Sequence, residues 1–311
     1  MTSGQIDHNI TDQSILVTGG AGFIGSHIAD ALVADNDVTV LDNLSSGYRR
    51  NVPEEAALIV GDVTNDGQRT TAMEGVDLVF HEAAVVSVAR SVEAPIETNR
   101  INADATLHLL EDARREDARV VIASSAAIYG HPDEVPITES HLKRPTSPYG
   151  MSKLAGDHYA RMYDELYDLS TVALRYFNAY GPRQPDGDYS GVIGTFVEQA
   201  RSGAPITING DGGQTRDFVH VEDIVRANVR AATTDATGEA YNVGTGNVVT
   251  ITELAERIRA AAGSDSLITH VEERSGDIRH SRADTTAARE RLGFAATVPL
   301  DEGLLTVPGL S

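Results

Sequence analysis

The stretch Thr18-Gly19-Gly20-Ala21-Gly22-Phe23-Ile24-Gly25 decides the fold of this chain. It follows an apolar, strand-like run, Ser14–Thr18, and opens a helical pattern that extends from Phe23 to Ala34. The three glycines suit a tight turn, a close approach of backbone to a pyrophosphate, and close packing of a helix on a strand. The first N–H groups of the helix would then face the pyrophosphate. This unit predicts a dinucleotide-binding site.

Strand-like and helical segments alternate over the part of the chain that follows. The strand-like runs are Asp37–Leu41, Ala57–Val60, Leu78–Phe80, Val120–Ala123 and Thr171–Arg175, and helical stretches include Ile101–Arg115 and Pro148–Tyr167. Such alternation predicts an α/β fold with a Rossmann-type, doubly wound parallel sheet covered by helices on both faces.

The rhythm changes after Arg175. A Gly- and Pro-rich loop, Asn178–Gly194, precedes expected helices at Thr195–Ser202, Phe218–Ala232 and Thr250–Ala262 and a strand at Pro205–Ile208. We therefore expect a smaller C-terminal α/β substrate lobe. The predicted cofactor domain comprises residues 1–176 and about 215–242, and the lobe comprises about 177–214 and 243–311.

The composition excludes several classes of protein. The chain has 311 residues, with 46 Asp and Glu against 25 Lys and Arg, a formal charge of −21. Such acidity argues against nucleic-acid binding and against an anionic membrane surface, and no apolar run approaches the ~18 residues of a membrane span. Without cysteine there are no disulfides, thiolate nucleophiles or cysteine-based metal sites. No secretory signal is evident, so a cytoplasmic location is expected. The acidity suits a halophilic, high-salt cytosol, although an ordinary acidic enzyme is the alternative.

Two carboxylates follow the second and third predicted strands. Asp42 can accept hydrogen bonds from an adenosine ribose and would repel a 2′-phosphate, which favours NAD over NADP. Asp62 could similarly receive the adenine amino group. Arg49 and Arg50 lie nearby and could meet a 2′-phosphate, so NADP is left open.

Tyr149 and Lys153 are the candidate catalytic pair. They are four residues apart and therefore share one face of a predicted helix. A nearby ammonium favours the phenolate and lowers the pKa of the tyrosine, which could then take a proton from a sugar hydroxyl while hydride leaves for nicotinamide. Ser124 and Ser125 end a predicted strand and could complete the proton path. The chain has only two lysines, Lys143 and Lys153, and one of them stands at this spacing.

Other enzyme classes lack their motifs. The ten histidines form no HExxH-type pair, so a zinc hydrolase and any metal site are not expected. There is also no GxSxG elbow, which argues against a serine hydrolase.

The chain resembles the extended short-chain dehydrogenase/reductase superfamily, and within it the NAD-dependent nucleotide-sugar 4-epimerases. The resemblance extends from about Ser14 to about Gly303 and rests on Thr18–Gly25, Asp42-Asn43-Leu44, Gly61-Asp62-Val63, His81-Glu82-Ala83-Ala84, Ser124–Gly130, Tyr149–Lys153, Arg175–Asn178, Thr215–Asp223, Tyr241–Gly246 and Gly276–Asp284. It implies a tightly held NAD that is reduced and reoxidised within each turnover. Tyr149 would be the base, Lys153 its electrostatic partner, and Ser125 the hydroxyl that bonds the substrate oxygen.

The resemblance also implies a set of cofactor contacts. They are Gly19, Gly22, Phe23, Ile24, Gly25, Asp42, Asn43, Ser45, Gly47, Asp62, Val63, Ala83, Ala84, Asn99, Ser124, Tyr149, Lys153 and Tyr176. In relatives, helices that correspond to Ala103–Arg115 and Leu154–Leu166 pair across a two-fold axis, so a homodimer is expected.

Arginines in the smaller lobe are candidates for binding a nucleoside diphosphate. Arg216, Arg274 and Arg279 could supply bidentate hydrogen bonds to two phosphates, although surface salt bridges are the ordinary alternative. The resemblance implies that Asn178 bonds a phosphate or sugar oxygen, that Asp277 faces the uridine ribose, and that Ser87, Val88 and Val192 approach the substrate. Ser281 would flank the C2 substituent of the sugar, where a small residue leaves room for an N-acetyl group.

The reaction type depends on the residues after Ser125. Related dehydratases and decarboxylases carry acidic residues there, whereas Ala126 and Ala127 cannot move protons. Epimerisation at C4 of a UDP-hexose is therefore the predicted function. A UDP-glucuronate 4-epimerase, another nucleotide-sugar dehydratase or reductase, and a non-catalytic NAD-sensing regulator are the alternatives.

Overall fold

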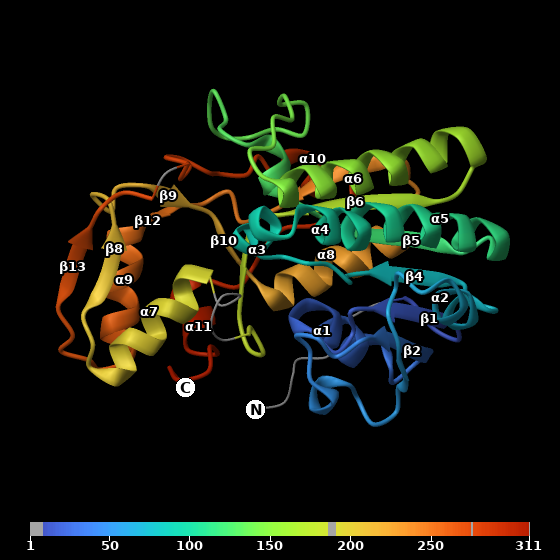
Figure 1. Ribbon diagram of the computed structural model, residues 1–311, viewed down its shortest axis with the longest axis horizontal. Helices are drawn as coiled ribbons and strands as arrows, with labels where there is room; N and C mark the ends of the chain where they lie inside the picture. Colours follow the sequence, from blue (N-terminus) through green and yellow to red (C-terminus); the bar gives the residue numbers. More distant parts are fainter. Residues whose placement is uncertain (1–8, 186–190, 275, 311) are drawn as a thin grey trace.

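Seven parallel strands form the central sheet of the computed structural model, which describes residues 9–185, 191–274 and 276–310. The order across the sheet is β11-β6-β5-β4-β1-β2-β3, so the chain winds outward in both directions from β1 and β4 (Figure 1). The strands are β1 Ser14–Thr18, β2 Asp37–Asp42, β3 Ala57–Val60, β4 Leu78–His81, β5 Arg119–Ser125, β6 Thr171–Tyr176 and β11 Glu239–Val243. This order confirms the predicted Rossmann-type sheet.

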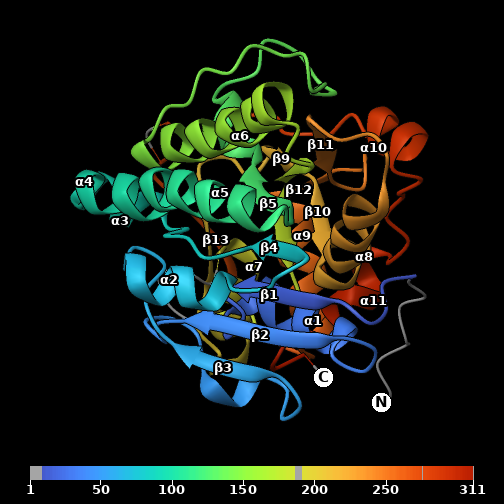
Figure 2. The same ribbon diagram turned by 90° about the vertical axis from the view of Figure 1, so that its right-hand side faces the viewer.

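Helices cover both faces of the sheet. Figure 2 shows α2, α5 and α6 on one side and α1 and α8 on the other. The helices of this part are α1 Phe23–Leu32, α2 Asp66–Met73, α3 Val88–Glu93, α4 Pro95–Asn99, α5 Ala105–Glu116, α6 Pro148–Tyr167, α8 Val221–Thr233 and α10 Thr286–Arg291. Single 3₁₀ turns occur at Arg49–Asn51 and Ala126–Tyr129, and a π-helical turn, Arg100–Asp104, joins α4 to α5.

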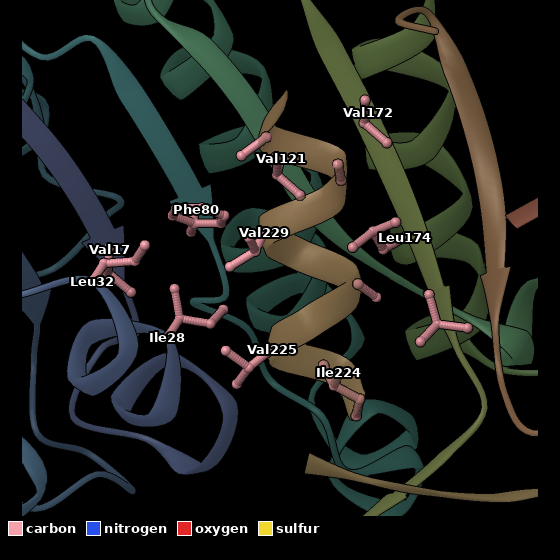
Figure 3. Packing of buried hydrophobic residues seen from close by; sticks show 14 of the residues in the cluster. Val17, Ile28, Leu32, Phe80, Val121, Val172, Leu174, Ile224, Val225 and Val229 are labelled. Atoms are coloured by element: carbon pink, nitrogen blue, oxygen red, sulfur yellow. The ribbon is translucent and has the colours of Figure 1, made fainter. Parts of the chain in front are cut away.

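The alternation of side chains along each strand separates two cores. Val17, Phe80, Val121 and Leu174 point to the face that α1 and α8 cover (Figure 3). Their sequence neighbours point to the other face and pack on α2, α5 and α6. Apolar packing therefore fills both faces of the sheet, and the open edge at the carboxyl ends of the strands is left for ligands.

A smaller lobe lies at one end of the molecule (Figure 1). Its helices are α7 Gly191–Ser202, α9 Ile251–Ala261 and α11 Leu300–Leu304, which enclose a separate apolar core. Its short strands pair as β13 Ile268–Val271 with β8 Ile206–Asn209, and β12 Val249–Thr250 with β9 Thr215–Arg216. A further pair, β7 Asn178–Tyr180 with β10 Phe218–His220, connects the lobe to the main sheet.

Three expectations about these elements differ from the structure. The loop expected at Asn178–Gly194 is shorter, because Asn178–Tyr180 forms β7 and α7 begins at Gly191, while its residues 186–190 lie outside the described part of the chain. The predicted helix at Phe218–Ala232 was wrong at its start, because Phe218–His220 forms β10, and His220 accepts a hydrogen bond from Glu222 N as α8 begins. Residues near α10 were expected in the lobe, but Ala288, Leu292 and Phe294 pack into the core beside α8. In the described part of the chain, no helix is both long and apolar enough for a membrane span.

Candidate functional site

The glycine-rich turn lies between β1 and α1. Gly19 has a φ of +68°, and a Cβ atom there would lie 2.7 Å from the backbone nitrogen of Ala83. Only glycine allows this turn to pack against the loop after β4. No side chain of the described residues caps the first turn of α1, so its N–H groups face the space in front of the turn.

A cavity of about 380 Å³ follows the carboxyl ends of the strands and begins at this turn. Of the predicted cofactor contacts, all but two line it: Gly19, Gly22, Phe23, Ile24, Gly25, Asp42, Asn43, Ser45, Asp62, Val63, Ala83, Ala84, Ser124, Tyr149, Lys153 and Tyr176. Glu82, Gln184 and Pro185 also line it and were not predicted.

Gly47 and Asn99 are not among the lining residues. A Cβ at Gly47 would lie 2.6 Å from the carbonyl carbon of Ala21, so this glycine supports the glycine-rich turn from behind. Asn99 is exposed and its amide donates to Asp104. The buried amide is that of Asn102, which donates to the carbonyl of Val85 and accepts from its N–H, and thereby holds the loop after β4.

Asp42 and Asp62, which were predicted to bind adenosine, are held by hydrogen bonds from neighbouring residues. Asp42 accepts from the N–H groups of Ala21 (2.9 Å) and Leu44 (2.7 Å). Although burial opposes the effect, hydrogen bonds from Thr64 and Asn43 hold the pKa of Asp62 below its usual value. The carboxylate oxygens of both residues can accept hydrogen bonds from hydroxyl or amino groups.

Helix α6 brings the candidate catalytic pair to the end of β5. Ser147 caps the helix by accepting from Gly150 N at 3.1 Å. A Cβ at Gly150 would lie 2.8 Å from the carbonyl oxygen of Ala127, so the glycine beside Tyr149 lets the helix approach the end of the strand. The Ser125 hydroxyl lies close enough to the phenol of Tyr149 to lower its pKa, and Lys153 donates to the carbonyl of Ala123 at 2.8 Å.

The pKa of Tyr149 differs from the expectation. Burial raises it above its usual value, while the hydrogen bond from Ser125 lowers it and the charge of Glu82 raises it further. The Lys153 ammonium does not contribute the lowering of the Tyr149 pKa that was expected of it. In the protein alone, Tyr149 is therefore a neutral phenol held in place, and positive charge brought by a ligand would be needed to favour the phenolate.

A buried ion pair ties α6 to the sheet. Asp157 lies on the same helix face as Lys153, and its oxygens accept from Arg175 at 2.8 and 2.9 Å and from the Ser124 hydroxyl at 2.8 Å. Arg175 also donates to the hydroxyl of Tyr129 and to the carbonyl of Glu139. The other lysine, Lys143, donates to the same Glu139 carbonyl, so it belongs to this network.

The smaller lobe places some predicted substrate contacts together. Arg216 forms an ion pair with Asp277 at 2.5 Å. Ser281 is buried and donates its N–H to the carbonyl of Thr215, which lies beside Arg216 in β9. The side-chain amide of Asn178 donates to the carbonyl of Asp217, the residue that follows Arg216. These four positions therefore gather around β9.

The remaining predicted contacts are more dispersed. Arg279 forms an exposed ion pair with Asp211 through two hydrogen bonds. The backbone carbonyl of Arg274 accepts a hydrogen bond from the N–H of Asp277. Ser87 is buried and caps α3, whereas Val88 is half exposed. Val192 lies in the first turn of α7 and packs on the core of the lobe. None of these five lines the main cavity. Among the described residues there is no acidic or histidine cluster suited to a metal ion.

Comparison with known proteins shows the family. Residues 15–244 match the NAD dependent epimerase/dehydratase family. The chain belongs to this family. It is 39% identical over 297 residues to a putative UDP-glucose 4-epimerase of Methanocaldococcus jannaschii, covering 94% of this chain and 96% of the relative. It is 33% identical to a UDP-N-acetyl-alpha-D-glucosaminuronate decarboxylase of Bacillus cytotoxicus, covering 93% and 94%.

Solved structures of the family have the same fold. A UDP-N-acetylglucosamine 4-epimerase from Methanobrevibacter ruminantium, in complex with UDP-N-acetylmuramic acid, superposes with a TM-score of 0.91 at 39% identity, covering 95% of this chain and 96% of that one. The UDP-glucose 4-epimerase of Thermus thermophilus in complex with NAD gives 0.88 at 37% identity, covering 96% and 98%.

NAD is the cofactor of this chain, and the described residues suit it. The glycine-rich turn leaves room for a pyrophosphate, and Asp42 offers a ribose acceptor in the same cavity. The Oε1 atom of Gln184 is buried at the cavity with no hydrogen-bond partner among the described residues, so it can accept a bond from a ligand. When bound, NAD supplies a hydride acceptor and donor.

Proposed function

We propose that this enzyme interconverts UDP-hexoses that differ in configuration at C4. Tyr149 takes the proton of the C4 hydroxyl, Ser125 hydrogen-bonds the same oxygen, and the C4 hydride leaves for the cofactor. The resulting 4-keto sugar turns its other face, the hydride returns to it, and Tyr149 gives back the proton. The acid–base groups thus end each turnover as they began.

The observation that carries the proposal is the surroundings of Ser125. The residues that follow it are Ala126 and Ala127, which begin a 3₁₀ turn and offer no side chain for a second proton transfer. Removal of water or carbon dioxide needs such a group, whereas epimerisation needs only the proton path of Tyr149 and Ser125. This argues against the dehydratase and decarboxylase alternatives.

The sugar-nucleotide preference rests on the smaller lobe. Arg216 beside Asp277 suits a nucleoside diphosphate, with the guanidinium toward phosphate and the carboxylate toward ribose. Ser281 is small, so we propose that N-acetylhexosamines are accepted in addition to glucose and galactose. Relatives described as acting on UDP-glucose and on UDP-N-acetylglucosamine support both choices.

A panel of UDP- and dTDP-sugars tests the function. The purified protein is incubated with each sugar without added NAD, over a range of salt concentrations, and the products are identified by NMR. Conversion between C4 epimers without added cofactor is the expected result and would indicate NAD retained from expression. Products that have lost water or carbon dioxide would contradict the proposal. If UDP-glucuronate were the sole substrate, the enzyme would be a UDP-glucuronate 4-epimerase instead.

We also propose that the chain forms a homodimer through α5 and α6. Met162, Leu166 and Tyr167 are apolar residues near the end of α6 with exposed side chains, which suits a surface covered by a second copy. Light scattering should give twice the mass of the chain, and Leu166→Glu should shift the mass toward the monomer.

A further inference from the structure

Glu82 has a carboxylate that lines the cavity but takes no part in the proposed reaction steps. Three carboxylates line the cavity in the described part of the chain. Asp42 and Asp62 lie at the ends of β2 and β3, on the adenosine side, whereas Glu82 follows β4 and lies on the side of Tyr149 and Lys153.

The strand register places Glu82 beside the lysine. His81 pairs with Ile122, so Glu82 comes alongside Ala123, whose carbonyl accepts the hydrogen bond from Lys153. The N–H of Glu82 donates to the carbonyl of Thr18 at 3.1 Å, which fixes the backbone between the ends of β1 and β5.

The carboxyl group of Glu82 is held by a buried chain of hydrogen bonds. The Tyr176 hydroxyl donates to Oε1 of Glu82 at 2.8 Å, and the amide of Asn228 donates to the same hydroxyl at 2.8 Å. Tyr176 pairs with Ser125 in the sheet, so this chain reaches across β5 from the far side of the catalytic serine. A carboxyl group fixed in this way has one orientation and acts on its neighbours through its charge.

We propose that Glu82 is a positioning residue whose charge sets how tightly Tyr149 and Lys153 hold their protons, and thereby the pH range in which the site works. The part that concerns catalysis rests on the proposed function.

The electrostatics agree with this geometry. Burial raises the pKa of Glu82, while the Tyr176 hydrogen bond and the Lys153 charge lower it. Burial lowers the pKa of Lys153, and Glu82 opposes that shift. Glu82 also raises the pKa of Tyr149. The groups that face this cluster are Lys153 and Tyr149 from α6, Tyr176 from β6 and the neutral His81 from β4, whose pKa burial lowers to about 3.

Removing a negative charge makes every neighbouring proton easier to lose, so neutralising Glu82 lowers the proton affinity of both Tyr149 and Lys153. If Tyr149 must be deprotonated and Lys153 protonated for turnover, both limbs of the kcat–pH profile move to lower pH in Glu82→Gln.

The lysine content allows a measurement that needs no substrate. Labelling with ¹³Cε-lysine gives two side-chain signals, because the chain has only Lys143 and Lys153, and Lys143→Arg assigns them. The titration midpoint of the Lys153 signal should be lower in Glu82→Gln than in the wild type by about half a pH unit or more, and unchanged in Glu82→Asp. Glu97→Gln, at a half-exposed pair with Arg90, is the control and should not move it.

The outcomes separate the two proposals. An unchanged Lys153 midpoint in a folded Glu82→Gln protein overturns the inference, whatever the enzyme does. A lowered midpoint together with a wild type that epimerises no sugar would reject the proposed function and leave the charge coupling standing. If epimerisation occurs and neither limb moves in Glu82→Gln, the catalytic part is wrong. Should Glu82→Gln not fold, Tyr176→Phe removes the hydroxyl that favours the Glu82 carboxylate and should lower the midpoint by a smaller amount.

Discussion

The cofactor cavity and the face of the smaller lobe around β9 are built in different ways. The cavity is lined by residues at the ends of neighbouring parallel strands, so the sheet itself fixes their positions. Around β9 the contacts come from distant parts of the chain, and the arginines already pair with carboxylates: Arg216 with Asp277, and Arg279 with Asp211. The first region is complete before a ligand arrives, whereas in the second the proposed phosphate would have to compete with ion pairs for the guanidinium groups.

The largest expected effect concerns the cofactor cavity. Lys153→Met removes the only ammonium in the described cavity lining and should lower kcat for epimerisation by about a hundredfold to ten-thousandfold. Lys143→Met is the matched control, because it removes the other lysine from a hydrogen bond to the Glu139 carbonyl outside the cavity. Steady-state rates with a UDP-hexose measure both variants. Equal losses in both would mean that lysine at either position acts through folding alone.

The same contrast explains what could be predicted from the sequence. Strand ends and the glycine-rich turn follow from local patterns, so most of the cavity lining was predictable. Asn99 and Asn102 stand three residues apart in one helical run, and only the packing of the π-helical turn shows that Asn102 is the buried one. Glu82 belongs to the motif His81-Glu82-Ala83-Ala84, but its proposed role depends on Tyr176 and Asn228, which are 94 and 146 residues away along the chain.

The smaller lobe was harder to predict for a related reason. Its strands are two to four residues long, too short for a periodic pattern, and β10 was predicted as part of a helix. Asp217 illustrates the difficulty. This buried carboxylate accepts from Thr245, Gly246 and Ala283, and these partners become neighbours only in the folded chain.

Ser281 tests whether the smaller lobe sets the sugar preference. Ser281→Tyr adds an aromatic ring at a buried position and should abolish conversion of UDP-N-acetylgalactosamine, by about a hundredfold in kcat/KM, while UDP-galactose loses much less. Ser281→Ala keeps the side chain small and serves as the control. If both sugars are lost equally in Ser281→Tyr, the residue does not discriminate the C2 substituent.

Arg216 tests the phosphate side of the same face. Arg216→Ala removes a largely buried guanidinium and leaves Asp277 unpaired, so KM for a UDP-sugar should rise by about 10- to 100-fold with a smaller change in kcat. Arg257→Ala, which breaks an exposed ion pair with Asp301 in the same lobe, should leave KM within about twofold. A lower kcat at unchanged KM in Arg216→Ala would place this arginine in the chemical step instead.

We expect salt to stabilise the protein through its acidic surface and to leave NAD binding in the cavity unchanged. A formal charge of −21 repels itself, and raising KCl from 0.1 to 1 M shortens the screening length from about 10 to about 3 Å. We therefore expect the unfolding temperature to rise by about 2 °C or more and activity to increase with it. The NAD content of the purified protein should not change, because the cavity groups proposed to hold the cofactor are buried or bonded to backbone. Sucrose stabilises by exclusion without screening charge, so an equal rise in sucrose would show that the acidic surface is not the cause.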